Sequence, residues 1–279
     1  MSTNMYTAGE SRRSFDLSNK VAVVTGATGI LGRWFSAALA DHGATVALVD
    51  RDQTACDSLA NELRAEFSVE ARGYGCDLAL TAKLSELADH IENDLGPVDI
   101  LHNNAASKGT SLDRFFDPIE DFDPMVWREI MAVNLDSAFF VAREFGSRMA
   151  RRFEGSIIQT ASIYGVVAPD QRIYEGSSYN GRPISSPAVY SASKAGIVGL
   201  TKYLACYWGE QGVRVNTLTP GGVSSGQNDE FVQKYSARIP LARMAQPSDI
   251  TGALVYLASP ASRYVTGQNI IVDGGLTSW

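Results

Sequence analysis

Short apolar segments rich in β-branched residues alternate along the chain with helix-length amphipathic segments. The apolar segments that predict strands cover residues 21–24, 44–49, 69–76, 98–101, 156–160, 213–216 and 269–272. The segments with helical periodicity cover residues 31–42, 54–67, 81–94, 124–150, 189–211 and 247–258. Short apolar strands separated by helices are typical of a parallel sheet that helices cover on both faces. Because such crossovers are right-handed, we expect a doubly wound α/β sheet.

The alternation continues to the C-terminus without a linker, a repeat or a charged block, which predicts a single domain over residues 18–279. Residues 1–17 are polar and lack periodicity, so they are expected to form a flexible N-terminal tail. One irregular segment, residues 166–188, is rich in Gly, Ser, Pro and Tyr and is too polar for the core. A loop of this length inside a compact domain is usually either functional or disordered.

Composition and charge argue against several classes of protein. Lys plus Arg number 24 and Asp plus Glu 31, and a net charge of −7 disfavours a nucleic-acid-binding protein. The apolar runs are much shorter than the roughly 18–20 residues of a membrane span, and no secretory signal is recognisable. Cys56, Cys76 and Cys206 have no paired spacing, and the three histidines have no ligand spacing. We therefore expect no metal site, no disulfide framework and a cytoplasmic location.

A glycine-rich turn, residues 25–32, follows the first predicted strand and opens the first predicted helix. In this position Gly26 permits a tight turn, Gly29 lets the backbone approach a pyrophosphate, and Gly32 lets the helix pack against the strand. Many strand-to-helix turns carry glycines for packing alone. The strand before this turn and the helix after it favour a dinucleotide site.

Asp50 ends the second predicted strand, 18 residues after Gly32. A carboxylate in this position accepts hydrogen bonds from ribose hydroxyls and repels a 2′-phosphate. Arg33 and Arg51 complicate this interpretation, because a nearby guanidinium is what a phosphorylated cofactor requires. Asp50 could also be a solvated residue at a strand end. On balance the sequence predicts NAD in preference to NADP.

Tyr190 and Lys194 lie four residues apart at the start of a strongly helical segment and therefore share one helix face. A phenol, with an ordinary pKa of about 10, is a poor base at neutral pH, and a neighbouring ammonium lowers that pKa. Ser162 follows a predicted strand at its C-terminal end, where it can hydrogen-bond the oxygen of a carbinol or carbonyl. A Tyr and a Lys at this spacing are more often surface residues. Their combination with Ser162 and the glycine turn favours catalysis.

These motifs make the sequence resemble the short-chain dehydrogenase/reductase family from about residue 19 to the C-terminus. The matching segments are the glycine turn, Asp77-Leu78, Asn103 to Ala106, Val133-Asn134, Ser162, Tyr190 to Lys194, Pro220-Gly221 and Asp273 to Gly275. The resemblance implies a Rossmann-type fold and a catalytic tetrad. In that tetrad Tyr190 is the acid/base, and Lys194 lowers its pKa and binds ribose. Ser162 orients the substrate, and Asn134 holds a water of a proton relay.

The resemblance also implies how a cofactor is held. Asp77 and Asn104 would contact its adenine side, Pro220 to Val223 would form the nicotinamide edge, and residues 221–245 would contain the substrate loop. The cofactor-binding residues expected are Gly26, Thr28, Gly29, Ile30, Leu31, Asp50, Arg51, Asp77, Leu78, Asn104, Ala105, Ala106, Tyr190, Lys194, Pro220, Gly221 and Val223. Members of the family usually form homodimers or homotetramers, and the long helix after Tyr190 would be a natural interface.

Two features depart from the family's pattern. The spacing of Gly26, Gly29 and Gly32 resembles the longer branch, which includes sugar-nucleotide epimerases and dehydratases. The chain length and the Asp273-Gly-Gly ending favour the shorter, single-domain branch instead. The interval from Ser162 to Tyr190 is 28 residues, about twice what the family typically shows.

The extra residues of this interval must emerge beside the catalytic residues. They offer Arg172, Tyr174, Glu175 and Arg182 as candidate substrate contacts, and either arginine could hold a carboxylate or a phosphate. A polar loop favours a polyhydroxylated or anionic substrate over an apolar one. The loop and the glycine spacing also resemble reductases of bacterial surface-sugar or flagellin modification. The alternative is a loop that packs at a subunit interface.

The sequence therefore predicts an NAD-dependent oxidoreductase that interconverts a secondary alcohol and a ketone on a polar, sugar-like substrate. One alternative is an epimerase or dehydratase that retains its NAD. Another is a dinucleotide-sensing protein without catalysis, and the presence of Ser162, Tyr190 and Lys194 argues against it.

Overall fold

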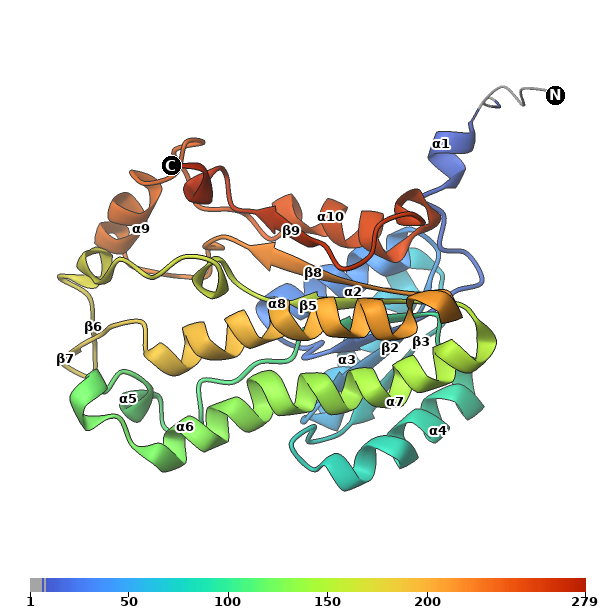
Figure 1. Ribbon diagram of the computed structural model, residues 1–279, viewed down its shortest axis with the longest axis horizontal. Helices are drawn as coiled ribbons and strands as arrows, with labels where there is room; N and C mark the ends of the chain where they lie inside the picture. The colour runs from blue at the N-terminus through green and yellow to red at the C-terminus, as the bar shows by residue number, and fades with distance from the viewer. Residues whose placement is uncertain (1–6, 8) are drawn as a thin grey trace.

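A seven-stranded parallel sheet forms the centre of the computed structural model, which describes residue 7 and residues 9–279 (Figure 1). The strands are β1 (Val21–Thr25), β2 (Thr45–Asp50), β3 (Ala71–Gly75), β4 (Ile100–Asn103), β5 (Gly155–Thr160), β8 (Val213–Pro220) and β9 (Asn269–Val272). Their order across the sheet is β3-β2-β1-β4-β5-β8-β9, and each neighbouring pair is parallel. The predicted doubly wound α/β sheet is confirmed.

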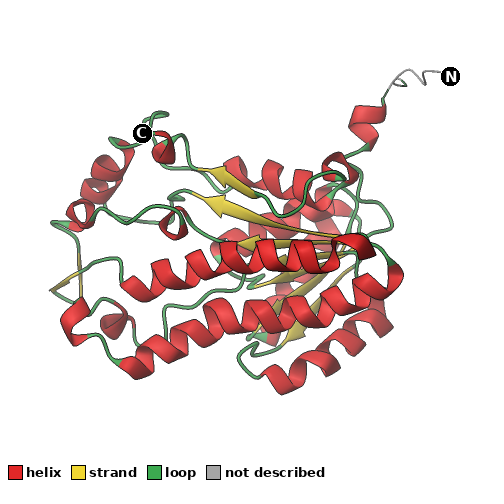
Figure 2. Cartoon of the chain, viewed as in Figure 1, coloured by secondary structure: helices red, strands yellow, loops and turns green. Residues whose placement is uncertain are grey.

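Helices cover both faces of this sheet (Figure 2). One face carries α4 (Leu84–Leu95), α7 (Ser137–Arg152) and α8 (Ala188–Trp208). The other face carries α2 (Ile30–Asp41), α3 (Gln53–Phe67) and α10 (Ser248–Ala258). No helix within the described part of the chain is long and apolar enough to cross a membrane.

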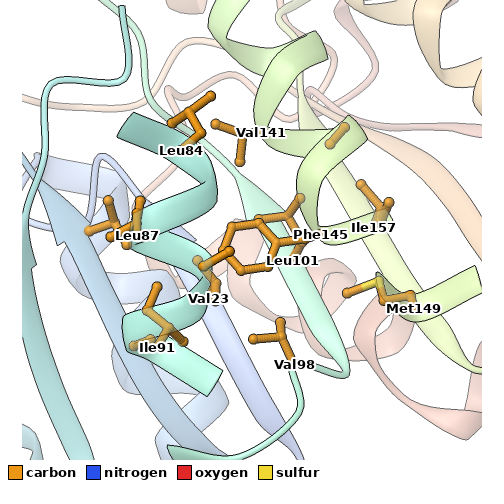
Figure 3. Packing of buried hydrophobic residues seen from close by; sticks show 14 of the residues in the cluster. Val23, Leu84, Leu87, Ile91, Val98, Leu101, Val141, Phe145, Met149 and Ile157 are labelled. Atoms are coloured by element: carbon orange, nitrogen blue, oxygen red, sulfur yellow. The ribbon is translucent and has the colours of Figure 1, made fainter. Parts of the chain in front are cut away.

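The strands place alternate side chains in two apolar cores, as the period of two in a strand requires. Val23 and Leu101 contact Phe145 of α7 on one face (Figure 3), whereas Val24 and Leu48 belong to the core on the other face. Full burial of each such side chain stabilises the fold by roughly 1.5–3 kcal/mol. The cores fix the strand ends rigidly, and the loops of the site start from those ends.

The N-terminal segment is anchored closer to its start than the sequence predicts. A short helix, α1 (Glu10–Arg13), precedes Leu17, which is fully buried and donates its N–H to the carbonyl of His42 at 2.9 Å. The pattern does not show this anchor, because a single apolar residue among polar ones has no periodicity. The flexible tail is predicted over residues 1–17, of which residues 1–6 and 8 lie outside the described residues.

The helical segment predicted over residues 124–150 is interrupted in the structure. It consists of α6 (Pro124–Met131), a π-helical turn (Ala132–Asp136) and α7. A π turn is a single-turn bulge inside an α-helix, so helical segments continue on both sides of it and the sequence reads as one helix. This turn contains Asn134.

The irregular segment over residues 166–188, here called the roof, is ordered into short elements. It contains the single turn η5 (Gln171–Tyr174) and a hairpin of β6 (Ser178–Tyr179) and β7 (Arg182–Pro183). The two residues of the hairpin turn, Asn180 and Gly181, have φ of 49° and 74°, as such tight turns require. The roof lies between α5 (Leu112–Phe115) and α9 (Asp229–Ser236) at one end of the molecule (Figure 1).

The remaining short turns are single helical turns in the connections. They are η1 (Thr81–Lys83), η2 (Ile119–Asp121), η4 (Ile163–Gly165), η6 (Gly209–Gln211), η7 (Pro260–Ser262) and η8 (Leu276–Ser278). Of these, η4 directly follows β5 and carries the residues next to Ser162.

Candidate active site

Two adjoining cavities open at the carboxyl ends of the central strands. The first, the glycine-turn cavity, has a volume of about 660 Å³ and is lined by the turn between β1 and α2, by Asp50 and by Asn104. The second, the Ser162 cavity, has a volume of about 490 Å³ and is lined by Ser162 and Lys194. Tyr190 lines both cavities, so the two cavities meet at this residue.

The glycine turn is packed so tightly that side chains would not fit. Gly26 has a φ of +62°, and a Cβ there would lie 2.8 Å from the Cα of Ala105. A Cβ at Gly32 would lie 2.0 Å from the carbonyl oxygen of Gly26. Gly29 caps α2 without a side-chain hydrogen bond, so the first N–H groups of that helix face the cavity without a side-chain partner. Such a helix start suits a pyrophosphate, and these residues fit a dinucleotide.

Thr25, at the end of β1, ties the glycine turn to the neighbouring strand. Its hydroxyl oxygen accepts hydrogen bonds from the N–H groups of Asn104 (3.0 Å) and Ala105 (3.1 Å). The Asn104 side chain donates in return to the carbonyls of Thr25 and Gly26. Thr25 was not predicted as a site residue, although a hydroxyl residue at the end of a buried strand is an available signal.

Asp50 holds the glycine turn from the other side. Its Oδ2 accepts hydrogen bonds from the Thr28 N–H (3.0 Å) and hydroxyl (2.6 Å), and its Oδ1 accepts one from the Arg51 N–H (2.8 Å). Arg51 lines the cavity. Arg33 is outside the lining and forms an ion pair with Glu62. Every residue expected from the sequence to contact a cofactor lines one of the two cavities.

Ser162, Tyr190 and Lys194 are brought together by β5, η4 and α8. Ser162 caps η4 by accepting a hydrogen bond from the Tyr164 N–H at 3.3 Å. The buried Lys194 donates from Nζ to the carbonyl of Thr160, the last residue of β5, at 3.0 Å. A Cβ at Gly165 would lie 2.5 Å from the Lys194 carbonyl carbon, so this glycine lets η4 pack directly on α8. The sequence analysis also missed Gly165.

The electrostatics of Tyr190 differ from the sequence expectation. Burial raises the pKa of the Tyr190 phenol above its ordinary value, and a hydrogen bond with Ser162 opposes this shift. The Nζ of Lys194 lies 6.0 Å from the centre of the Tyr190 ring and donates its hydrogen bond to the Thr160 carbonyl. Burial lowers the pKa of Lys194 itself to about 8.

Asn134 lies behind the glycine-turn cavity rather than in its lining. Its Oδ1 accepts a hydrogen bond from the N–H of Ser107, which lines that cavity, at 2.7 Å. Its Nδ2 is buried without a hydrogen-bond partner among the described residues. A buried amide donor with spare capacity is suited to hold a water molecule.

Besides Tyr190, six aromatic side chains form much of the Ser162 cavity wall, and of these six the sequence indicated only Tyr174. They are Phe115, Phe116, Tyr164, Tyr174, Phe231 and Tyr235. Tyr174 of the roof packs on Phe231 of α9 with ring centres 5.3 Å apart, and Phe231 stacks on Tyr235 at 5.6 Å. Each of these rings lies in a short or irregular segment, where a lone aromatic residue cannot be distinguished from a packing residue.

Only part of the predicted substrate set reaches this cavity. Tyr174 lines it, whereas Arg172, Glu175 and Arg182 do not. Arg172 pairs with Asp170 at 2.8 Å, Arg182 pairs with Asp117 at 2.9 Å, and Glu175 is exposed. The first ion pair lies within the roof, and the second joins the roof to Asp117 outside it. Both arginine side chains remain in contact with water. Across the described residues no cluster of His, Cys, Asp and Glu could hold a metal ion.

Known proteins of similar sequence share the whole length of the chain. A family model described as enoyl-(acyl carrier protein) reductase matches residues 26–277. The chain is 34% identical to a D-threitol dehydrogenase of Mycolicibacterium smegmatis, over 94% of this chain and 95% of that protein. It is 35% identical to a galactitol 2-dehydrogenase (L-tagatose-forming) of Cereibacter sphaeroides, over 96% and 99%.

Solved structures agree with this relationship. A gluconate 5-dehydrogenase from Burkholderia cenocepacia, in complex with NADP and tartrate, matches with a TM-score of 0.84 and 30% identity, over 95% of this chain and 98% of that chain. A short-chain dehydrogenase from Leptospira borgpetersenii with bound NAD⁺ matches with a TM-score of 0.81 and 33% identity, over 98% and 97%. With its motifs in order on the observed fold, the chain belongs to the short-chain dehydrogenase/reductase family.

Proposed function

We propose that the protein is an NAD(H)-dependent dehydrogenase that interconverts a secondary alcohol and a ketone on a polyol or sugar-like substrate. The observation that carries this proposal is the placement of Tyr190, which lines both the glycine-turn cavity and the cavity that holds Ser162 and Lys194. The polyol class is supported by relatives that act, by name, on threitol and galactitol.

The chain's own residues divide the work of the reaction. Oxidation of a carbinol removes a hydride from carbon and a proton from oxygen. NAD⁺ supplies the hydride acceptor when it is bound. Ser162 donates a hydrogen bond that orients the substrate oxygen, and the Tyr190 phenolate takes the proton from it. Lys194, fixed by the Thr160 carbonyl, keeps a positive charge near this oxygen, and Asn134 is suited to hold a water behind it.

The choice of NAD over NADP is part of the proposal. The Asp50 carboxylate lies at the end of β2 in the cavity lining and would repel a 2′-phosphate. Arg33, which the sequence left as a candidate phosphate ligand, is paired with Glu62 outside the lining. Arg51 remains in the lining, and one of the similar structures binds NADP, so cofactor choice needs its own measurement.

The test is NADH or NADPH formation at 340 nm with threitol, galactitol, gluconate and 2-butanol as substrates. We expect turnover with NAD⁺ and the polyhydroxylated compounds, and a loss of at least about a hundredfold in the Tyr190→Phe variant. Turnover with 2-butanol alone would refute the substrate class. Binding of NAD⁺ without any turnover would favour an epimerase, a dehydratase or a sensor.

We further propose a homodimer or homotetramer that functions in the cytoplasm. Tyr203 and Tyr207 on α8 are exposed, and their rings stack 5.9 Å apart on the helix that the sequence indicated as an interface. Cys206 presents an exposed free thiol beside them, which suits a reducing compartment. Light scattering after size exclusion tests the assembly, and a monomer at all micromolar concentrations would contradict it.

A further inference from the structure

The Ser162 cavity is positively charged in a protein whose net charge is −7. The charged side chains in its lining are Lys108 and Lys194, and no described Asp, Glu or Arg lines it. A cavity lined in this way attracts an anionic group more strongly than a neutral one.

The two lysines differ in what else they do. Lys194 is buried and donates to the Thr160 carbonyl beside the catalytic residues. Lys108 is exposed where the two cavities meet, with its Nζ 6.0 Å from the ring centre of Phe115, another lining residue. No described carboxylate forms an ion pair with Lys108. The nearby Glu129 is bonded to the N–H of Thr110 instead.

Three acidic side chains around the roof are bonded to other groups and lie outside the lining of the Ser162 cavity. Asp113 accepts a hydrogen bond from Asn180, Asp117 pairs with Arg182, and Asp170 pairs with Arg172. Arg172 and Arg182 are paired and lie outside this lining. Besides the buried Lys194, the cation in the lining of the Ser162 cavity, within the described chain, is therefore Lys108.

We propose that Lys108 binds the terminal carboxylate of a sugar acid whose carbinol is held by Ser162 and Tyr190. This inference rests on the proposed function and extends it from polyols to their anionic derivatives. A single ammonium balances one carboxylate charge, whereas a phosphate carries nearly two. The aromatic wall, including Phe115 and Tyr174, then covers the carbon chain between the two ends.

The experiment compares gluconate with sorbitol, a neutral polyol of equal chain length, in the wild-type protein and in three variants. Lys108→Gln removes the charge, Lys108→Arg keeps it, and Lys202→Gln removes the charge of an exposed lysine on α8 as a control. We expect Lys108→Gln to lower kcat/KM for gluconate at least about tenfold relative to sorbitol, mainly through KM. Lys108→Arg should keep most of the wild-type preference for gluconate over sorbitol, and Lys202→Gln should keep all of it.

Because Lys108 lines both cavities, dinucleotide binding is measured separately. The Kd of NAD⁺, from fluorescence titration, should change less than threefold in Lys108→Gln. Raising NaCl from 0.05 to 0.5 M should weaken the gluconate preference of the wild-type protein and leave that of the variant unchanged.

Several results would overturn the assignment. One is an equal loss of kcat/KM for gluconate and for sorbitol in Lys108→Gln. Another is a rise in the Kd of NAD⁺ as large as the loss of kcat/KM for gluconate. The third is a wild-type protein that prefers sorbitol or 6-phosphogluconate to gluconate. If no compound is turned over, the proposed function fails. Lys108 is then tested by the rise in Tm that gluconate causes in the presence of NADH, which Lys108→Gln should abolish.

Discussion

The backbone N–H of Gly222 donates a hydrogen bond to the phenol oxygen of Tyr235 at 2.6 Å. Tyr235 comes from α9 and is buried, and a Cβ at Gly222 would lie 2.5 Å from its ring. The bond joins the segment after β8, expected from the family to face the nicotinamide, to a helix that also contacts the roof through Phe231 and Tyr174. The segment after β8 and the roof therefore both contact α9 beside the Ser162 cavity.

Tyr235→Phe is expected to loosen the segment after β8 without removing any ring contact. The Gly222 N–H would lose its acceptor in a partly buried contact, and the net loss of such a hydrogen bond costs about 0.5–1.5 kcal/mol. We expect a severalfold fall in kcat and a lower free energy of unfolding in urea. Tyr264→Phe, which removes the hydroxyl of a fully exposed tyrosine, is the control. Wild-type kinetics and stability in Tyr235→Phe would contradict the role given to this bond.

Gly165→Ala is expected to separate Ser162 from Lys194. The new Cβ would lie 2.5 Å from the Lys194 carbonyl carbon, so η4 must move away from α8. Since a displacement of about 1 Å in a catalytic group can cost a hundredfold, kcat should fall by roughly that factor. Gly199→Ala is the matched control on α8, because a Cβ there would meet nothing within 4 Å. Activity of Gly165→Ala equal to that of Gly199→Ala would show that the close contact does not position Ser162.

The buried Lys194 predicts how stability changes with pH. Burial lowers its pKa to about 8 from an ordinary value of 10.5, so between these values the unfolded chain binds a proton that the folded chain lacks. The contribution of Lys194 to stability therefore rises as pH increases from 8 to 10.5, by about 3 kcal/mol in all, and is constant below this window.

Urea unfolding of the wild-type protein and Lys194→Met at pH 7, 8.5 and 10 isolates this contribution from other titrating groups. Lys194→Met should be the more stable protein at pH 7, because a buried charge has been removed, although it should be inactive. The difference in free energy of unfolding between Lys194→Met and the wild-type protein should become smaller as the pH rises. A difference in stability that does not vary with pH would mean that Lys194 titrates normally in the folded protein.

Asp50→Ser should shift cofactor preference toward NADP⁺. The substitution removes the charge that repels a 2′-phosphate and leaves Arg51 in the lining, so the ratio of kcat/KM for NADP⁺ to that for NAD⁺ should rise at least about tenfold. Thr28 loses its acceptor as well, which should lower affinity for both cofactors. Asp41→Ser, at the exposed end of α2, controls for the loss of one negative charge. An unchanged ratio would place cofactor choice elsewhere in the lining.

The sheet and the strand-end residues could be predicted because their signals are local. The first two strands are apolar over nearly their whole length, and Asp50 ends the second of them. Ser162 follows β5, whose centre is apolar. The glycine turn adds a local constraint, since Gly26 and Gly32 leave no space for a Cβ. These signals do not depend on which distant residues come to lie nearby.

The walls of the Ser162 cavity could not be predicted, because they depend on contacts between distant segments. Arg182 was predicted as an anion ligand, yet it forms an ion pair with Asp117, which is 65 residues away in sequence and lies outside the roof. Lys108 carried no motif, and only the folded arrangement leaves it without a carboxylate partner. The π turn around Asn134 was hidden for a different reason, since it preserves the helical pattern.

Arg172→Gln and Arg182→Gln are expected to affect stability slightly and anion preference not at all. Both guanidinium groups are more than half exposed, and each pairs with an aspartate outside the Ser162 cavity lining or at its rim, so each pair contributes about 0–1 kcal/mol. The ratio of kcat/KM for gluconate to that for sorbitol should stay within about twofold of the wild-type value in both variants. A large fall in that ratio for either arginine would mean that the roof moves during turnover and brings its guanidinium to the substrate. In that event the substrate carboxylate would belong to the arginine that the sequence first indicated, and Lys108→Gln should leave the ratio unchanged.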